Sequence, residues 1–270
     1  MTELNSIIQD AFNLFAELIA LQKSYLSKIS LPRPFVTQEE IYQHLSQGET
    51  IVSFYLPKID SHLLSELRQE ICCLISKHRP EKAGQIEKIN GYLSDYPHIY
   101  KDFLQKEQAL PIPQGMLSEE NELLNFVVYQ TMRPFLQKFA SQTHSFIQAD
   151  RWLRDYCPVC GEKPTFSYLR REDGKRVLVC PLCATEWNYR YLVCTWCGNQ
   201  EHQSLKFFEV IDVTGYEVYV CEKCRGYLKT FNEKKGTNHD DWLLEDIKTL
   251  MLDMIAFREG FTRPGGKILQ

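Results

Sequence analysis

Residues 157–187 read CPVCGEKPTFSYLRREDGKRVLVCPLCATEW, and two C-x-x-C pairs flank a segment with the pattern of a β-hairpin. Asp173-Gly174 is a strong turn signal, and the residues on either side are mostly aromatic, branched or otherwise apolar. The C-x-x-C pattern recurs in CTWCG at 194–198 and in CEKCR at 221–225. This internal repeat predicts two tandem β-modules, each built around a pair of cysteine turns.

The spacing of the cysteines predicts metal binding. A C-x-x-C pair on a tight turn directs two thiolates at one ion, and two such pairs supply a tetrahedral set. Between the pairs lie 19 residues in the first repeat and 23 in the second, within or close to the usual range for such sites. This favours sequential pairing of the motifs, although a crossed pairing of the first with the third stays open. The predicted ligands are Cys157, Cys160, Cys180 and Cys183 at the first site, and Cys194, Cys197, Cys221 and Cys224 at the second.

The residue after each pair bears on the shape of the turn. Gly161 and Gly198 stand where a left-handed backbone is favourable, whereas Ala184 and Arg225 take that place in the other two pairs.

The two sets of four cysteines predict two Cys-bound metal ions, and four thiolates suit zinc and rubredoxin-type iron equally well. Zinc makes such sites structural, and iron adds one-electron chemistry.

The remaining chain is predicted to be mainly helical. Apolar residues recur at helical spacing before residue 150, and Thr37 with Glu40 has the pattern of a capping box. Pro134 should kink or split the last of these helices. The predicted helices cover 5–26, 37–45, 61–78, part of 83–107, and 118 to about 148. LPIPQG at 110–115 is a predicted linker, and a helix capped by Asn238 and ended by Gly260 is expected after residue 232.

The predicted fold class is therefore α+β. An N-terminal all-α bundle precedes tandem rubredoxin-like or zinc-ribbon modules and a C-terminal helix. The predicted boundaries are 1–150 for the helical domain, 151–193 and 194–232 for the two metal modules, and 233–270 for the C-terminal helix and tail. Two further cysteines, Cys72 and Cys73, lie in the apolar segment EICCLISK and are expected to be buried.

Composition argues against several functions. The 270 residues carry a net charge of −4, and residues 151–230 hold 12 Lys and Arg against 10 Asp and Glu, too small an excess for nucleic-acid binding. The basic residues of the first hairpin, Arg170, Arg171, Lys175 and Arg176, are interpreted as a solvated turn. No catalytic motif, signal peptide or membrane-spanning run is recognisable, so we expect a cytoplasmic protein without membrane insertion that is not an enzyme.

The motifs CPVCGEKP, CPLCATEWNYR, CTWCGN and CEKCRGYLKTF together resemble the formate dehydrogenase accessory protein family, FdhE. The resemblance is strong over residues 151–263. It implies a cytoplasmic maturation factor that contacts the catalytic subunit of formate dehydrogenase before export and holds iron in rubredoxin-like sites. Two other interpretations remain: a rubredoxin-like electron-transfer protein that acts on its client, and a zinc-ribbon adaptor that binds nucleic acid.

Overall fold

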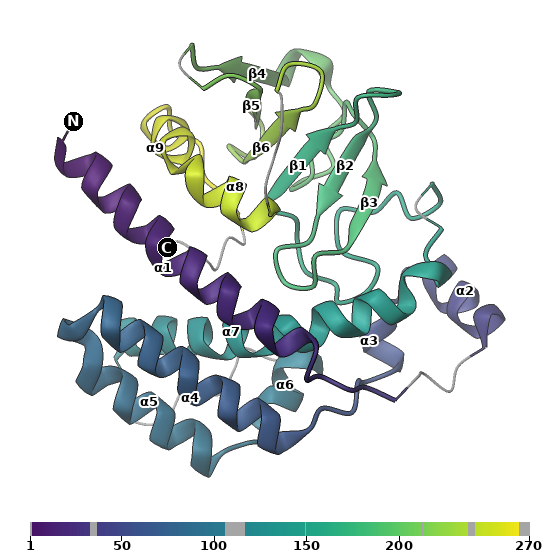
Figure 1. The fold of residues 1–270 in the computed structure, drawn as a ribbon. Coiled ribbons are helices and arrows are strands. Elements are labelled where there is room, and N and C mark those ends of the chain that lie inside the picture. Colours follow the sequence, from purple (N-terminus) through teal and green to yellow (C-terminus); the bar gives the residue numbers. More distant parts are fainter. Residues whose placement is uncertain are drawn as a thin grey trace.

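The structure is a computed structural model that describes residues 2–32, 37–105, 117–148, 150–211, 213–236 and 241–264 (Figure 1). Its helices before the sheet are α1 (Thr2–Leu26), α2 (Gln38–Gln47), α3 (Ile51–Phe54), α4 (Ser61–His78), α5 (Ala83–Asp95), α6 (Ile99–Gln105) and α7 (Ser118–Thr143). The strands are β1 (Phe166–Leu169), β2 (Arg176–Val179), β3 (Glu186–Tyr189), β4 (Leu205–Glu209), β5 (Tyr216–Cys221) and β6 (Tyr227–Asn232). Two helices, α8 (Trp242–Lys248) and α9 (Leu250–Arg258), follow the sheet. This arrangement confirms the α+β class.

The helical half follows the apolar periodicity of the sequence. Helix α4 covers the predicted range, and the capping box at the start of α2 is present, with the Thr37 hydroxyl accepting from the Glu40 amide at 3.2 Å. Within the predicted range 83–107, the described residues form two helices, α5 and α6, on either side of Pro97. The predicted linker at 110–115 lies outside the described residues. Cys72 is buried, whereas Cys73 is exposed and was wrongly expected to be buried.

Helix α7 does not split at Pro134, contrary to one of the outcomes expected from the sequence. Proline lacks the amide hydrogen that would satisfy the carbonyl four residues earlier. In this protein the side-chain amide of Gln22, on α1, donates to that carbonyl of Gln130 at 2.8 Å. The partner lost within α7 is therefore replaced from a neighbouring helix, and α7 continues to Thr143.

The six strands form one sheet in the order β3-β2-β1-β6-β5-β4. The predicted β1–β2 hairpin is present, a second hairpin joins β4 to β5, and β1 pairs in parallel with β6, which joins the strands of both modules. Strand β6, whose residues YLKTF lie in the CRGYLKTF motif, was not predicted, because it pairs with β1 from far earlier in the chain. The domain boundaries remain a prediction.

Two helices occupy the region where a single C-terminal helix was expected. The break falls at Thr249, whose hydroxyl donates to the carbonyl of Glu245 at 2.7 Å. The buried ammonium of Lys229, on β6, donates to the carbonyls of Asp246 and Thr249 at 2.6 and 3.3 Å. These side-chain donors satisfy carbonyls at the end of α8, so the helix can stop there. The predicted cap, Asn238, lies outside the described residues, and the Asp241 carboxylate caps α8.

Helix α1 lies between the other helices and the C-terminal pair, and it contacts α4, α7 and α8 (Figure 1). The main hydrophobic core runs from the helices to β2 and β3 and includes the first four cysteines of the repeat. A smaller core lies between β5, β6 and α9. Among the described residues, no helix has the length and apolar character that crossing a bilayer requires.

Candidate metal centres

The first four-cysteine cluster is closed by the β1–β2 hairpin. Phe166 on β1 pairs with Val179 on β2, which places the cysteine turn before β1 next to the one after β2. The sulfur atoms of Cys157 and Cys183 are 3.4 Å apart, and those of Cys160 and Cys180 are also 3.4 Å apart. All four side chains are buried. We call this group the inner cluster.

The second cluster has the same arrangement but a different exposure. Its sulfur atoms lie 3.7 Å apart between Cys194 and Cys224, and 3.8 Å apart between Cys197 and Cys221. Cys197 is exposed and Cys224 is half-buried. We call this group the outer cluster. The structure therefore groups the motifs sequentially, and the crossed pairing is not observed.

Both clusters have dimensions that suit a tetrahedral ion. A zinc–sulfur bond of about 2.3 Å gives sulfur–sulfur edges of about 3.8 Å in a regular tetrahedron. The ligand atoms of each cluster all lie within 4.8 Å of one another. Each cluster can hold one metal ion, and four thiolates suit zinc or iron.

The backbone of each cysteine turn supports the sulfur atoms. The amides of Cys183, Trp196 and Gly226 each point at a cysteine sulfur at 3.4 Å, which offsets the charge of a thiolate. All four turns place the residue after the second cysteine in the left-handed region. Its φ is 73° at Gly161, 58° at Ala184, 71° at Gly198 and 58° at Arg225. The shape is common to the four turns even where the residue is not glycine.

Without a cation, the thiols of a cluster cannot all ionise together. Burial and the neighbouring thiols raise the pKa of Cys180 well above its ordinary value. At the outer cluster burial also opposes ionisation, but the amides of Cys224 and Lys223 outweigh it and lower the pKa of Cys221 to about 7. A bound dication would stabilise the thiolates, as tetrahedral metal sites require.

The helical half contributes directly to the inner cluster. The first two amides of α3 donate to this cysteine turn, from Ile51 to the Pro158 carbonyl at 3.0 Å and from Val52 to the Val159 carbonyl at 2.9 Å. The guanidinium of Arg133, on α7, donates to the Pro181 carbonyl at 2.9 Å. Arg133 is buried, so its positive charge lies beside the second turn of the cluster. Arg133 could not be predicted from the sequence, because the apolar pattern of a long helix does not indicate which of its polar residues contacts a distant turn.

The CRGYLKTF motif connects the outer cluster to the C-terminal helices. Arg225 donates to the carbonyls of Glu259 and Gly260, at 2.6 and 3.1 Å, at the end of α9. The Tyr227 hydroxyl donates to the carboxylate of Asp253 at 2.6 Å. Two residues further on, Lys229 forms a buried ion pair with Asp246 at 2.7 Å. Tyr227 therefore packs inside the fold, and so does Trp187, which is buried and donates to the Arg154 carbonyl.

Together, the six-stranded sheet, the two tetrathiolate clusters and the helical domain define a metal-binding protein of the double cysteine-knuckle class. Family models match two segments, "FdhE, central domain" over residues 156–190 and "FdhE, C-terminal domain" over residues 192–269. These two segments, which contain the inner and the outer cluster, are therefore similar to the FdhE family of formate dehydrogenase accessory proteins, and this match supports the resemblance predicted from the motifs.

Similar proteins extend the match to the helical half. A protein from Aquifex aeolicus named "Protein FdhE homolog" is 27% identical over 258 residues, which cover 93% of this chain and 85% of that protein. A homologue of the same name from Pseudomonas aeruginosa is 32% identical over 123 residues, covering 43% of this chain and 40% of that protein. The crystal structure of the FdhE protein from Pseudomonas aeruginosa has the same fold, with a TM-score of 0.65 and 20% identity, over 94% of this chain and 86% of the other.

Proposed function

We propose that this protein is a maturation factor that binds the catalytic subunit of formate dehydrogenase in the cytoplasm, before the subunit is exported. The observation that carries the proposal is the match to two FdhE family models. One model covers the inner cluster, and the other covers the outer cluster and the C-terminal helices. A rigid sheet with two metal sites and a large helical flank suits a protein that holds another protein.

We propose that the eight cysteines of the two clusters are the metal ligands and that the protein is not an enzyme. Four thiolates fill the coordination sphere of a tetrahedral ion and leave no position open for a substrate. The ions would supply folding energy by joining each pair of cysteine turns. The residues around them hold the turns in place, through the α3 amides and Arg133 at the inner cluster.

A rubredoxin-like electron-transfer function is the second candidate. The exposed Cys197 favours it, because electron transfer needs one edge of the metal site near the surface. Visible and EPR spectra of protein purified without oxygen distinguish the two functions. A spectrally silent, zinc-loaded protein that supports full maturation would exclude electron transfer.

Gene deletion tests the proposed function. The deletion strain should lose formate dehydrogenase activity while the transcript of the catalytic subunit remains unchanged. Complementation with the wild-type gene should restore activity, whereas Cys157→Ser should restore little, because it removes one ligand of the inner cluster. Cys73→Ser is the matched control, since Cys73 is exposed and lies outside both clusters. Normal activity in the deletion strain would contradict the proposal.

A further inference from the structure

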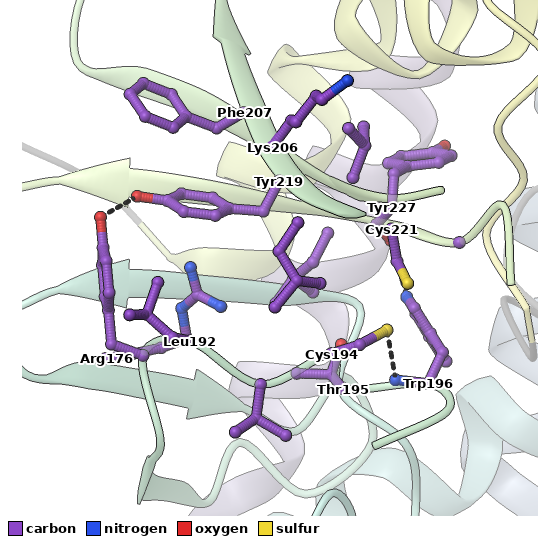
Figure 2. A pocket seen from close by; sticks show the side chains of 16 residues that line it. Arg176, Leu192, Cys194, Thr195, Trp196, Lys206, Phe207, Tyr219, Cys221 and Tyr227 are labelled. Atoms are coloured by element: carbon purple, nitrogen blue, oxygen red, sulfur yellow. Dashed lines mark hydrogen bonds between the residues drawn. The ribbon is translucent and has the colours of Figure 1, made fainter. Parts of the chain in front are cut away.

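A cavity of about 200 Å³ lies beside the outer cluster (Figure 2). It opens between the start of β2, the segment 191–196, and the strands β4 and β5. Cys194 and Cys221 form part of its wall, so it adjoins the outer cluster without being part of it. The side chains that matter for its chemistry are those of Arg176, Tyr191, Leu192, Phe207 and Tyr219. We call it the Arg176 pocket.

Arg176 is buried in this pocket, and among the described residues no carboxylate forms a direct ion pair with it. Only 3% of the residue is exposed, contrary to its interpretation as part of a solvated turn. Its Nε and Nη2 atoms have no hydrogen-bond partner among the described residues. The guanidinium lies 4.1 Å from the centre of the Tyr219 ring and 5.1 Å from that of Tyr191, and Figure 2 shows it beneath Tyr219. These rings contact the cation and favour its charged form, but neither ring provides a hydrogen-bond partner for Nε or Nη2.

Glu217 is the carboxylate that favours the charge of Arg176, but it forms its hydrogen bonds and its ion pair with other residues. Its carboxylate accepts from the Tyr219 hydroxyl at 2.6 Å and from the Asn232 amide at 2.8 Å. It also pairs with the ammonium of Lys235 at 2.9 Å. Glu217 favours the charge of Arg176 at longer range, but its carboxylate is already paired with these other groups and forms no hydrogen bond with Nε or Nη2 of Arg176. A buried cation with free donors destabilises the fold, so its presence indicates an anionic ligand.

The mouth of the pocket is apolar and lies at an open sheet edge. Tyr191, Leu192 and Phe207 are 41%, 48% and 51% exposed, and all three line the pocket. Strand β4 is the last strand of the sheet and pairs only with β5 within the described part of the chain. An open strand edge can accept an extended peptide, whose backbone adds to the sheet while its side chains enter pockets.

We propose that the Arg176 pocket binds the carboxylate of an acidic residue in an extended peptide segment of a partner protein, which adds to the free edge of β4. The guanidinium fork suits the two oxygens of a carboxylate. Apolar residues next to the acid would cover Tyr191, Leu192 and Phe207. That this partner is the formate dehydrogenase subunit rests on the proposed function. The binding of an acidic peptide in the Arg176 pocket is independent of that function.

Calorimetric titration of the metal-loaded protein tests the pocket. The probes are the blocked peptide acetyl-Thr-Val-Phe-Glu-Val-Thr-amide and its counterpart with Gln in place of Glu. The wild-type protein should bind the Glu peptide at least about tenfold more tightly, since a hydrogen-bonded charge pair contributes that much. Equal affinities, or no binding of either peptide at millimolar concentration, would overturn the proposal without any variant.

A variant separates binding from folding. Arg176→Met should abolish the preference for the Glu peptide and keep the metal content and melting temperature close to those of the wild type, because an apolar side chain suits this site. Arg190→Met, at an exposed arginine of the same module, is the matched control and should keep the preference. A preference retained in Arg176→Met would overturn the proposal. Arg176→Lys keeps the charge without the fork and should bind with intermediate affinity.

Two further arms separate a peptide from a small acid. N-acetylphenylalanine should bind more weakly than the Glu peptide, and equal binding would overturn strand addition. Peptides that are N-methylated at alternate residues lose donors along one edge at a time, so one of the two methylated sets should lose binding. Normal formate dehydrogenase activity in the deletion strain would contradict the proposed function and leave these binding results standing.

Discussion

At the scale of single residues, the position after the second cysteine of each turn is the one where residue type affects backbone strain. All four turns place the residue after the second cysteine at positive φ. Glycine takes this conformation without strain, whereas an L-residue with a Cβ is strained by about 1 kcal/mol or more. Arg225 remains there with its guanidinium bonded to the carbonyls of Glu259 and Gly260, directly after α9. Ala184 is exposed, and its methyl side chain can form no such hydrogen bond.

Ala184→Gly should therefore stabilise the metal-loaded protein, by up to about 1 kcal/mol. The reciprocal change, Gly198→Ala, should destabilise it by about 1 kcal/mol, since no atom outside Gly198 and its two chain neighbours lies within 4 Å of the added Cβ and only backbone strain changes. Chemical denaturation of the two variants and the wild type measures both effects. A loss of stability in both variants would show that strain at this position does not control the turn.

At the scale of the elements, a buried charge network attaches α8 and α9 to β6. Lys229 lies within 2.7 Å of Asp246 and 2.6 Å of Asp253, and Arg263 donates to the Asp246 carboxylate at 2.8 and 2.9 Å. Burial opposes the ionisation of Asp246, but Arg263 and Lys229 outweigh it and lower its pKa to about 2. The network explains why a lysine can occupy the centre of a sheet beneath two helices.

Asp246→Asn should destabilise the protein by about 3 kcal/mol, because it leaves buried cations without part of their counter-charge. Glu222→Gln, which breaks the exposed pair with Lys206, is the control and should cost less than about 1 kcal/mol. Denaturation at neutral pH measures both values. A similar small effect in both variants would mean that the network contributes little.

The same network predicts a pH dependence. The pKa of Asp246 is lower in the folded state than its ordinary value of 3.8. Its ionisation therefore stabilises the fold fully above about pH 4, and this contribution is lost as the pH falls toward 2. The stability difference between the wild type and Asp246→Asn should be constant above pH 4 and shrink below it. Acid also releases metal from both proteins. Because that effect is common to the wild type and the variant, it cancels in the difference between their free energies of unfolding.

At the scale of the whole molecule, the two clusters differ in their surroundings. The inner cluster belongs to the main core and is held by α3 and α7, whereas the cysteines of the outer cluster lie outside both hydrophobic cores. Exposed Cys197 gives a competing ligand access to the outer cluster. The two ions should therefore leave at different rates.

A chromogenic chelator should remove metal in a fast and a slow phase of equal size. Cys194→Ser should eliminate the fast phase, because it removes a ligand of the outer cluster. Cys157→Ser should eliminate the slow phase and also lower the melting temperature of the helical half, which packs on the inner cluster. Release of both ions in a single phase, or loss of the slow phase in Cys194→Ser, would contradict this assignment.

The sequence by itself determined the local features of this protein. Helical periodicity, the Thr37 capping box, the Asp173-Gly174 turn and the C-x-x-C spacing depend on residues close together in the chain, so their patterns are readable. Only the tertiary structure decided the rest, because it depends on residues far apart in the chain. Examples are the Gln22 amide that supports α7 at Pro134, Arg133 beside the inner cluster, and the β1–β6 pairing that unites the sheet. Arg176 belongs with them, since a hairpin arginine becomes a buried cation only when β5 places Tyr219 over it.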